Sequence, residues 1–118
     1  MYGDFQVVDP RTGKSVRCTY QALILAIATR HADAVDVKFL VDGNPVWIAL
    51  PHTAWDEYRR RTGRAMSDPM AVEVAGHFLK SALAAGAESE REFHTLTLAE
   101  TMKHVEELVG DERLAAHT

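Results

Sequence analysis

The sequence predicts an α+β fold, in which a small antiparallel sheet of two β-hairpins packs against about four α-helices. Three observations lead to this fold class. Asp42-Gly43 separates two alternating apolar runs, another strand pair comes before them, and helical spacing dominates from Thr53 onward. Strands that cluster in one part of a chain, with helices in another, are typical of α+β domains.

The first hairpin is predicted from Phe5–Val8 and Ser15–Cys18, which a Pro- and Gly-containing turn connects. Gly13 supplies the left-handed residue that such turns need. Cys18 is the only cysteine of the chain, so an internal disulfide is excluded and a reducing, cytoplasmic location is expected. Because Cys18 shares the apolar parity of Val16, we expect a buried small hydrophobe rather than a reactive thiolate.

A helix is predicted from Tyr20 to His31, because apolar residues recur there at helical spacing. Thr19 would be its N-cap. One helical face would carry Tyr20, Leu23, Ile24, Ile27 and His31. Leu25 lies on the opposite side, so this helix is expected to be buried on more than one face.

The central hairpin is predicted from Val35 to Leu50, with Asp42-Gly43 as a two-residue type I′ turn. This turn pairs Phe39 with Val46 and makes one face of the hairpin wholly apolar. A Gly43-Asn44 turn would keep the same faces, since a two-residue slip preserves parity. Asn44 precedes a proline, however, and residues before proline avoid helical dihedral angles.

The opposite face of this hairpin carries Lys38, Leu40 and Trp47, together with Asp36 and Ala49. If helices cover this face, these residues belong to the core. If the face is open, an aromatic-aliphatic patch beside charges is the composition expected of a protein interface. The sequence leaves both interpretations open.

Two helices are predicted directly after the hairpin. The first begins at Pro51-His52-Thr53 with Thr53 as its cap, and Gly63 is placed to end it. The second opens at Asp68-Pro69, where a capping residue precedes a proline at the first helical position. It is expected to run to about Leu83.

A fifth short strand could span Glu92–Leu96. Thr97 and Glu100 have the spacing of a capping box, which predicts a last helix to about Val109. Residues 1–110 are therefore expected to form one globular domain, followed by a frayed polar tail at 111–118.

Length and composition agree with one folded domain. The chain has 118 residues, 47% of them hydrophobic and 25% charged, which is ordinary for a globular protein with a single core. The net charge of −4 gives no general attraction to nucleic acid or to anionic membranes. The longest apolar run, Ala22–Ala28, is too short to cross a bilayer, and the N-terminal residues lack the pattern of a signal peptide.

One repeated spacing is compatible with metal binding. Glu73 lies four residues before His77, and Glu100 lies four residues before His104, so each pair shares a helical face. Two such helices could offer Zn²⁺ or iron four ligands, with Glu107 as a fifth. Helical projection, however, places both pairs opposite the apolar faces. We therefore interpret them as solvated surface pairs and expect no metal or cofactor.

Two further sets of residues were considered as binding sites. His31, His52 and Tyr58 could line a small-molecule site between sheet and helices. The arginines of 59–64 could contact nucleic-acid phosphates, but acidic neighbours and the overall charge make this footprint weak. No phosphate loop, dinucleotide-binding motif or nucleophile elbow is present, so the sequence does not favour an enzyme.

The leading hypothesis is a non-catalytic interaction or regulatory module that forms a homodimer. It would self-associate through the face of Lys38, Leu40 and Trp47 or through a hairpin edge. A small-molecule-binding protein or weak enzyme that uses His31, His52 and Tyr58 is the second hypothesis. Nucleic-acid contact through Arg59–Arg64 ranks third.

Overall fold

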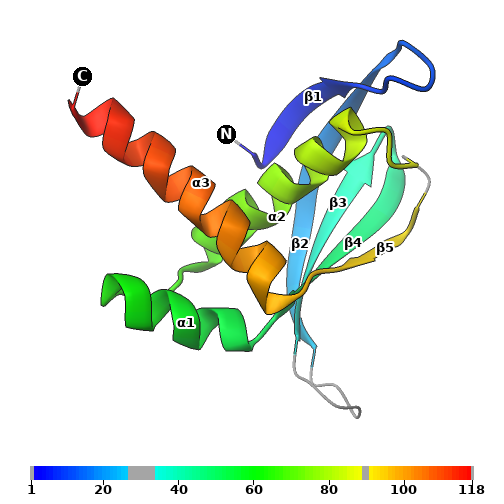
Figure 1. Ribbon diagram of the computed structural model, residues 1–118. Coiled ribbons are helices and arrows are strands. Elements are labelled where there is room, and N and C mark those ends of the chain that lie inside the picture. Colours follow the sequence, from blue (N-terminus) through cyan, green and yellow to red (C-terminus); the bar gives the residue numbers. More distant parts are fainter. Residues whose placement is uncertain (1, 27–33, 89–90, 118) are drawn as a thin grey trace.

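Five strands form one sheet, and three helices lie on one side of it (Figure 1). The computed structural model describes residues 2–26, 34–88 and 91–117. The strands are β1 (Asp4–Val8), β2 (Ser15–Ala26), β3 (Ala34–Val41), β4 (Asn44–Pro51) and β5 (Phe93–Thr95). The helices are α1 (Thr53–Thr62), α2 (Asp68–Ala84) and α3 (Leu98–His117).

The α+β class is confirmed, but the sheet is mixed rather than wholly antiparallel. Strands β1 to β4 follow one another as antiparallel neighbours, and β5 lies parallel to β4 at the edge. Two parallel strands need a long connection between them. Helices α1 and α2 supply that connection, and they return the chain to the end of the sheet where β4 begins (Figure 1).

The helix predicted from Tyr20 to His31 is wrong. Strand β2 continues to Ala26 and pairs with β3 up to the Ala26–Ala34 partners. A register shift between Tyr20 and Ala22 marks a β-bulge, and the extra residue breaks the two-residue alternation that would have identified a strand. The described residues therefore contain three helices rather than the expected four. The rest of the predicted helix, at 27–31, lies outside the described residues.

The central hairpin has the predicted turn and register. Asp42 and Gly43 both have positive φ, at 48° and 84°, as a two-residue hairpin turn of this kind requires. Phe39 pairs with Val46 and Val37 pairs with Ile48. The fully apolar face predicted for this hairpin is therefore confirmed.

The core lies between this apolar face and the helices α2 and α3, which pack directly on the sheet. Phe39, Ile48 and Leu79 are completely buried there. Cys18 is also completely buried, and burial, followed by the charge of Asp42, raises the pKa of its thiol to about 12. The prediction that Cys18 is a buried small hydrophobe is confirmed.

The boundaries of α1 and α2 agree with most of the predicted signals. Gly63 ends α1 in the left-handed conformation, with φ of 73°, and its N–H donates to the carbonyl of Arg59. The predicted cap Asp68 is wrong, because it is already the first residue of α2; Ser67 caps the helix, and its hydroxyl accepts from the backbone N–H of Met70. Thr53 is not the cap of α1, because His52 before it already has helical dihedral angles.

The capping box at the start of α3 is confirmed. The backbone N–H of Thr97 donates to the Glu100 carboxylate at 3.0 Å, and the Glu100 N–H donates to the Thr97 hydroxyl at 3.1 Å. The helix continues to His117, past the expected end at Val109 and through the expected tail, because a single glycine at position 110 weakens a helix without ending it. None of the described helices is long and apolar enough to span a membrane.

Candidate functional site

One face of the sheet is buried under helices, and the other has no helix on it in the part of the chain that the structure describes (Figure 1). Along β3 the two faces alternate residue by residue. Val35, Val37 and Phe39 are buried, whereas Asp36 and Lys38 between them are partly exposed. The question that the sequence left open is thereby answered: the face that carries Trp47 is not covered by the described helices.

The centre of this open face is formed by four neighbouring strands. Residues that are direct partners across strands point to the same side of a sheet. The open face is therefore defined by Ala22, Ile24, Ala34, Asp36, Lys38, Leu40, Trp47, Ala49, Phe93 and Thr95. Its apolar members include Ile24, which is 48% exposed, and Phe93, which is 62% exposed. These are large exposures for apolar residues of a sheet.

The three interface candidates from the sequence, Lys38, Leu40 and Trp47, all lie on the open face. Sequence analysis missed Ile24 and Phe93. The helical spacing places Ile24 on the core face of the predicted helix, where the structure has strand β2, and the bulge hides the alternation of β2. The register of the three-residue β5 beside Trp47 left no recognisable pattern in the sequence.

Two rows of side chains cross the middle of the open face. The Lys38 row contains Ala22, Lys38, Trp47 and Phe93, and the Asp36 row contains Ile24, Asp36, Ala49 and Thr95. In the first row, the Lys38 ammonium lies 5.6 Å from the centre of the Trp47 ring, within the range of a cation–π contact. In the second row, burial raises the pKa of Asp36 above its ordinary value.

The edges of the central hairpin are occupied. β3 pairs with β2 along its whole length. On the other side of the hairpin, the Trp47 N–H donates to the carbonyl of Glu92 at 2.6 Å, and the Leu96 N–H donates to the carbonyl of Ala49 at 3.0 Å. The hairpin edge is therefore not available at its centre for pairing with a second chain.

Of the four residues considered as metal ligands, Glu73, His77, Glu100 and His104, the structure brings the two histidines together. His77 of α2 and His104 of α3 meet, with their Nδ1 atoms 2.7 Å apart, and Glu107 lies beside them. The helical projection that placed both histidines on solvated faces is wrong, because α2 and α3 pack against each other along these faces. Glu73 and Glu100 do not join: the Glu73 carboxylate accepts the backbone N–H of Tyr2, and Glu100 belongs to the capping box.

Two aromatic rings pack against the pair formed by His77 and His104. The Tyr2 ring lies edge-on to His77 at 5.1 Å, and the Phe78 ring lies edge-on to His104 at 5.6 Å. Gly76 makes the approach of Tyr2 possible, since a Cβ at this position would lie 2.2 Å from the Tyr2 carbonyl oxygen. Burial, and then the neighbouring His77, lower the pKa of His104 below its ordinary value.

Two of the three residues predicted for a small-molecule site lie within the described part of the chain. His31 lies outside the described residues. His52 is exposed, and its ring stacks on Trp55 with centroids 6.0 Å apart. Tyr58 is half-buried against the core. Two surface hollows of about 410 and 480 Å³ are lined by other residues, so a site formed by His52 and Tyr58 stays an untested prediction.

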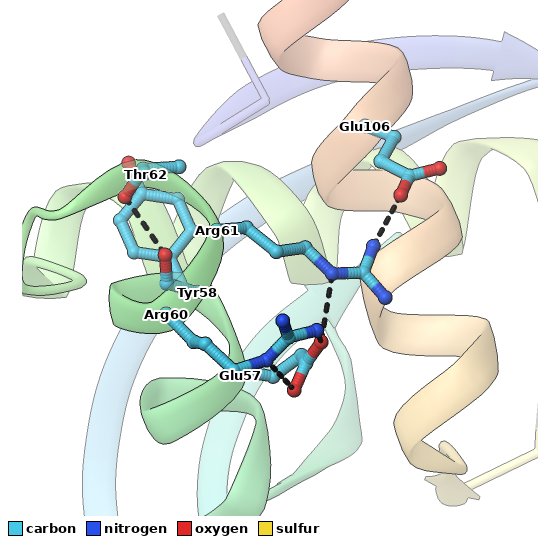
Figure 2. Close-up of polar contacts among 6 residues, drawn as sticks. All are labelled: Glu57, Tyr58, Arg60, Arg61, Thr62 and Glu106. Carbon is cyan, nitrogen blue, oxygen red and sulfur yellow. Dashed lines mark hydrogen bonds and ion pairs between the residues drawn. The ribbon is translucent and has the colours of Figure 1, made fainter.

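The arginine cluster contributes to the packing of the helices. Figure 2 shows Glu57 of α1 between Arg60 and Arg61, with Arg61 extended to Glu106 of α3. Hydrogen bonds from Arg60 and then Arg61 lower the pKa of Glu57 to about 2. Two of the arginines proposed for nucleic acid are thus already paired within the protein, although their role toward nucleic acid stays an untested prediction.

Comparisons with protein-family models, with curated proteins and with solved structures gave no match.

Proposed function

We propose that this protein is a non-catalytic interaction module that self-associates by stacking its open sheet face on that of a second copy. The observation that supports this most directly is the set of apolar side chains on this face, with Ile24 and Phe93 exposed and Trp47 half-buried. Exposed apolar side chains gathered on one face are characteristic of an interaction surface. Symmetric dimers are the commonest assembly of soluble proteins.

The two rows of the open face complement each other in size. Consider a twofold axis that lies in the interface, perpendicular to the strands, and crosses β3 at Val37. This axis places the Lys38 row of one protomer on the Asp36 row of its partner. Trp47 then meets the partner's Ala49, and Ile24 meets the partner's Ala22. Each large side chain is placed opposite a small one, which is the arrangement that close packing requires.

The same axis also matches the charges. Lys38 of one protomer faces Asp36 of the other, and the contact occurs twice because of the symmetry. Burial already raises the pKa of Asp36 in the isolated chain, so a cation opposite it would offset the cost of desolvating its carboxylate. Farther from the axis, Leu40 faces the partner's Ala34, again a large residue on a small one. The face is thus self-complementary, which favours a second copy over an unrelated partner.

The size of the face sets the strength of the expected dimer. Four strand spacings of about 4.8 Å and eight residues at about 3.3 Å each give a face of about 500 Å². Two such faces bury about 1,000 Å², at the lower end for a specific interface. We therefore expect a reversible dimer with a dissociation constant of about 1–100 µM.

Sedimentation velocity across this concentration range tests the proposal. The wild-type mass is expected to rise from 13.1 kDa toward twice that value as concentration increases. Trp47→Ala is expected to weaken the dimer at least about thirtyfold, since a central tryptophan contributes about 2 kcal/mol or more. Leu98→Ala is the matched control, because Leu98 is an exposed large hydrophobic residue on α3, on the helical side.

A wild-type chain that stays monomeric throughout the range would refute the proposal. A dimer that Trp47→Ala leaves intact, while Leu98→Ala dissociates it, would move the interface to the helical side.

A further inference from the structure

We propose that His77, His104 and Glu107 form a binding site for a divalent transition-metal ion, with Zn²⁺ as the expected occupant. A bound ion would link α2 to α3, and none of the three ligands lies on the open sheet face. Imidazole nitrogens with one carboxylate are a common ligand set for Zn²⁺. Carboxylates alone would instead suit Ca²⁺ or Mg²⁺.

The three side chains are close enough to share an ion after adjustment. The Nδ1 atoms of His77 and His104 are 2.7 Å apart, and the Glu107 Oε2 atom lies 3.9 Å from His104 Nδ1 and 3.5 Å from His77 Nε2. Ligands of a tetrahedral Zn²⁺ with bonds of about 2.0–2.1 Å lie about 3.3 Å apart. The two Nδ1 atoms must therefore separate by about half an ångström, and the carboxylate must approach His104 Nδ1 by a similar amount and turn from the Nε2 side of His77 toward its Nδ1 side.

The surroundings favour this adjustment. Glu107 is 45% exposed at its side chain, so its carboxylate is free to turn toward the imidazoles. The His77 and His104 side chains are only 13% and 10% exposed, so they are held in place by packing.

The metal ion would replace the single hydrogen bond that connects the His77 and His104 rings. Two neutral imidazoles whose Nδ1 atoms face each other can share one proton, so one ring donates and the other accepts. When the ion binds, both Nδ1 lone pairs are directed to it and both rings carry their proton on Nε2. The number of protons on the pair does not change. Within the described residues no fourth ligand joins the cluster, so water would complete the coordination.

Isothermal titration of the whole chain with Zn²⁺, together with the visible spectrum of the Co²⁺-loaded protein, tests this site. We expect one ion per chain, a tetrahedral Co²⁺ spectrum, and a raised melting temperature with Zn²⁺. His77→Gln and His104→Gln are each expected to weaken binding at least about a hundredfold. Glu107→Gln removes a partly exposed ligand with little risk to folding and is expected to weaken binding about tenfold or more.

Two matched controls separate this site from surface binding. His52→Gln removes an exposed histidine just before α1, and Glu88→Gln removes an exposed carboxylate outside the cluster. Both variants are expected to bind Zn²⁺ like the wild type. Imidazole ¹⁵N spectra should show the Nδ1 signals of His77 and His104 shifting together as the ion binds. A folded wild-type protein that binds no Zn²⁺ at millimolar concentration would overturn the proposal. Binding that Glu107→Gln and the histidine variants leave unchanged would overturn it as well.

Discussion

Asp36→Lys and Lys38→Asp chains are each expected to be monomeric, whereas an equimolar mixture of the two is expected to form heterodimers. In either variant alone, the proposed twofold axis places like charges opposite each other twice. Such contacts across an interface cost several kcal/mol, so each homodimer should be weakened at least about a hundredfold. In the mixture, every cation of one chain faces an anion of the other, and the affinity should return to within about tenfold of the wild type.

Analytical ultracentrifugation of each variant and of the mixture measures this effect. Lys14→Asp and Glu88→Lys provide a control pair with the same changes of net charge at exposed positions outside the open face. These control chains should dimerise alone like the wild type and gain nothing on mixing. If the open-face variants dimerise alone, or if their mixture stays monomeric, Lys38 and Asp36 do not face each other across a twofold axis.

Phe39→Ala is expected to lower the free energy of unfolding by about 3–5 kcal/mol, the cost typical of removing a buried phenylalanine ring. Phe39 is completely buried, and the rings of Phe5 and Tyr20 each lie edge-on to it at 6.2 Å. For a domain with an ordinary stability of about 5–15 kcal/mol, this loss removes a large part of the total.

Urea unfolding in dilute solution, where the monomer dominates, measures this loss. Val8→Ala is a suitable control, because Val8 is an exposed residue of β1 and should change stability by no more than about 0.5 kcal/mol. A loss below about 1 kcal/mol for Phe39→Ala would mean that Phe39 is not in the core. The assignment of the covered and open faces would then be reversed.

The central hairpin could be predicted from the sequence because the residues that determine it are neighbours in the chain. The Asp42-Gly43 turn fixes the register, and the register fixes which residues share a face. The capping box of Thr97 and Glu100 and the end of α1 at Gly63 could be predicted for the same reason. Each depends on a few residues whose side chains or dihedral angles act on their own neighbours.

The extent of β2 could not be predicted in this way. The segment from Tyr20 to Ala26 has an apolar pattern compatible with either a helix or a strand, and pairing with β3 decides between them. The bulge beside Gln21 depends on that pairing as well. The error had a direct consequence for the site, because it removed Ile24 from the open face and assigned it to the core.

The meeting of His77 and His104 is also a property of packing. Each lies opposite the most apolar stripe of its own helix, so the helical projection indicated solvent. The projection could not include a second helix that packs on this flank, and α2 and α3 do pack there. Two histidines on separate helices, 27 positions apart, carry no local sign that they will touch.

Intermolecular nuclear Overhauser effects in a sample of half labelled and half unlabelled chains test the central proposal most directly. At concentrations above the dissociation constant, we predict contacts from the Trp47 indole protons of one protomer to the methyl group of the partner's Ala49. Contacts from Ile24 to the partner's Ala22 should accompany them. The absence of intermolecular contacts on the open face, or contacts that instead involve α3 residues such as Leu98, would contradict the proposal.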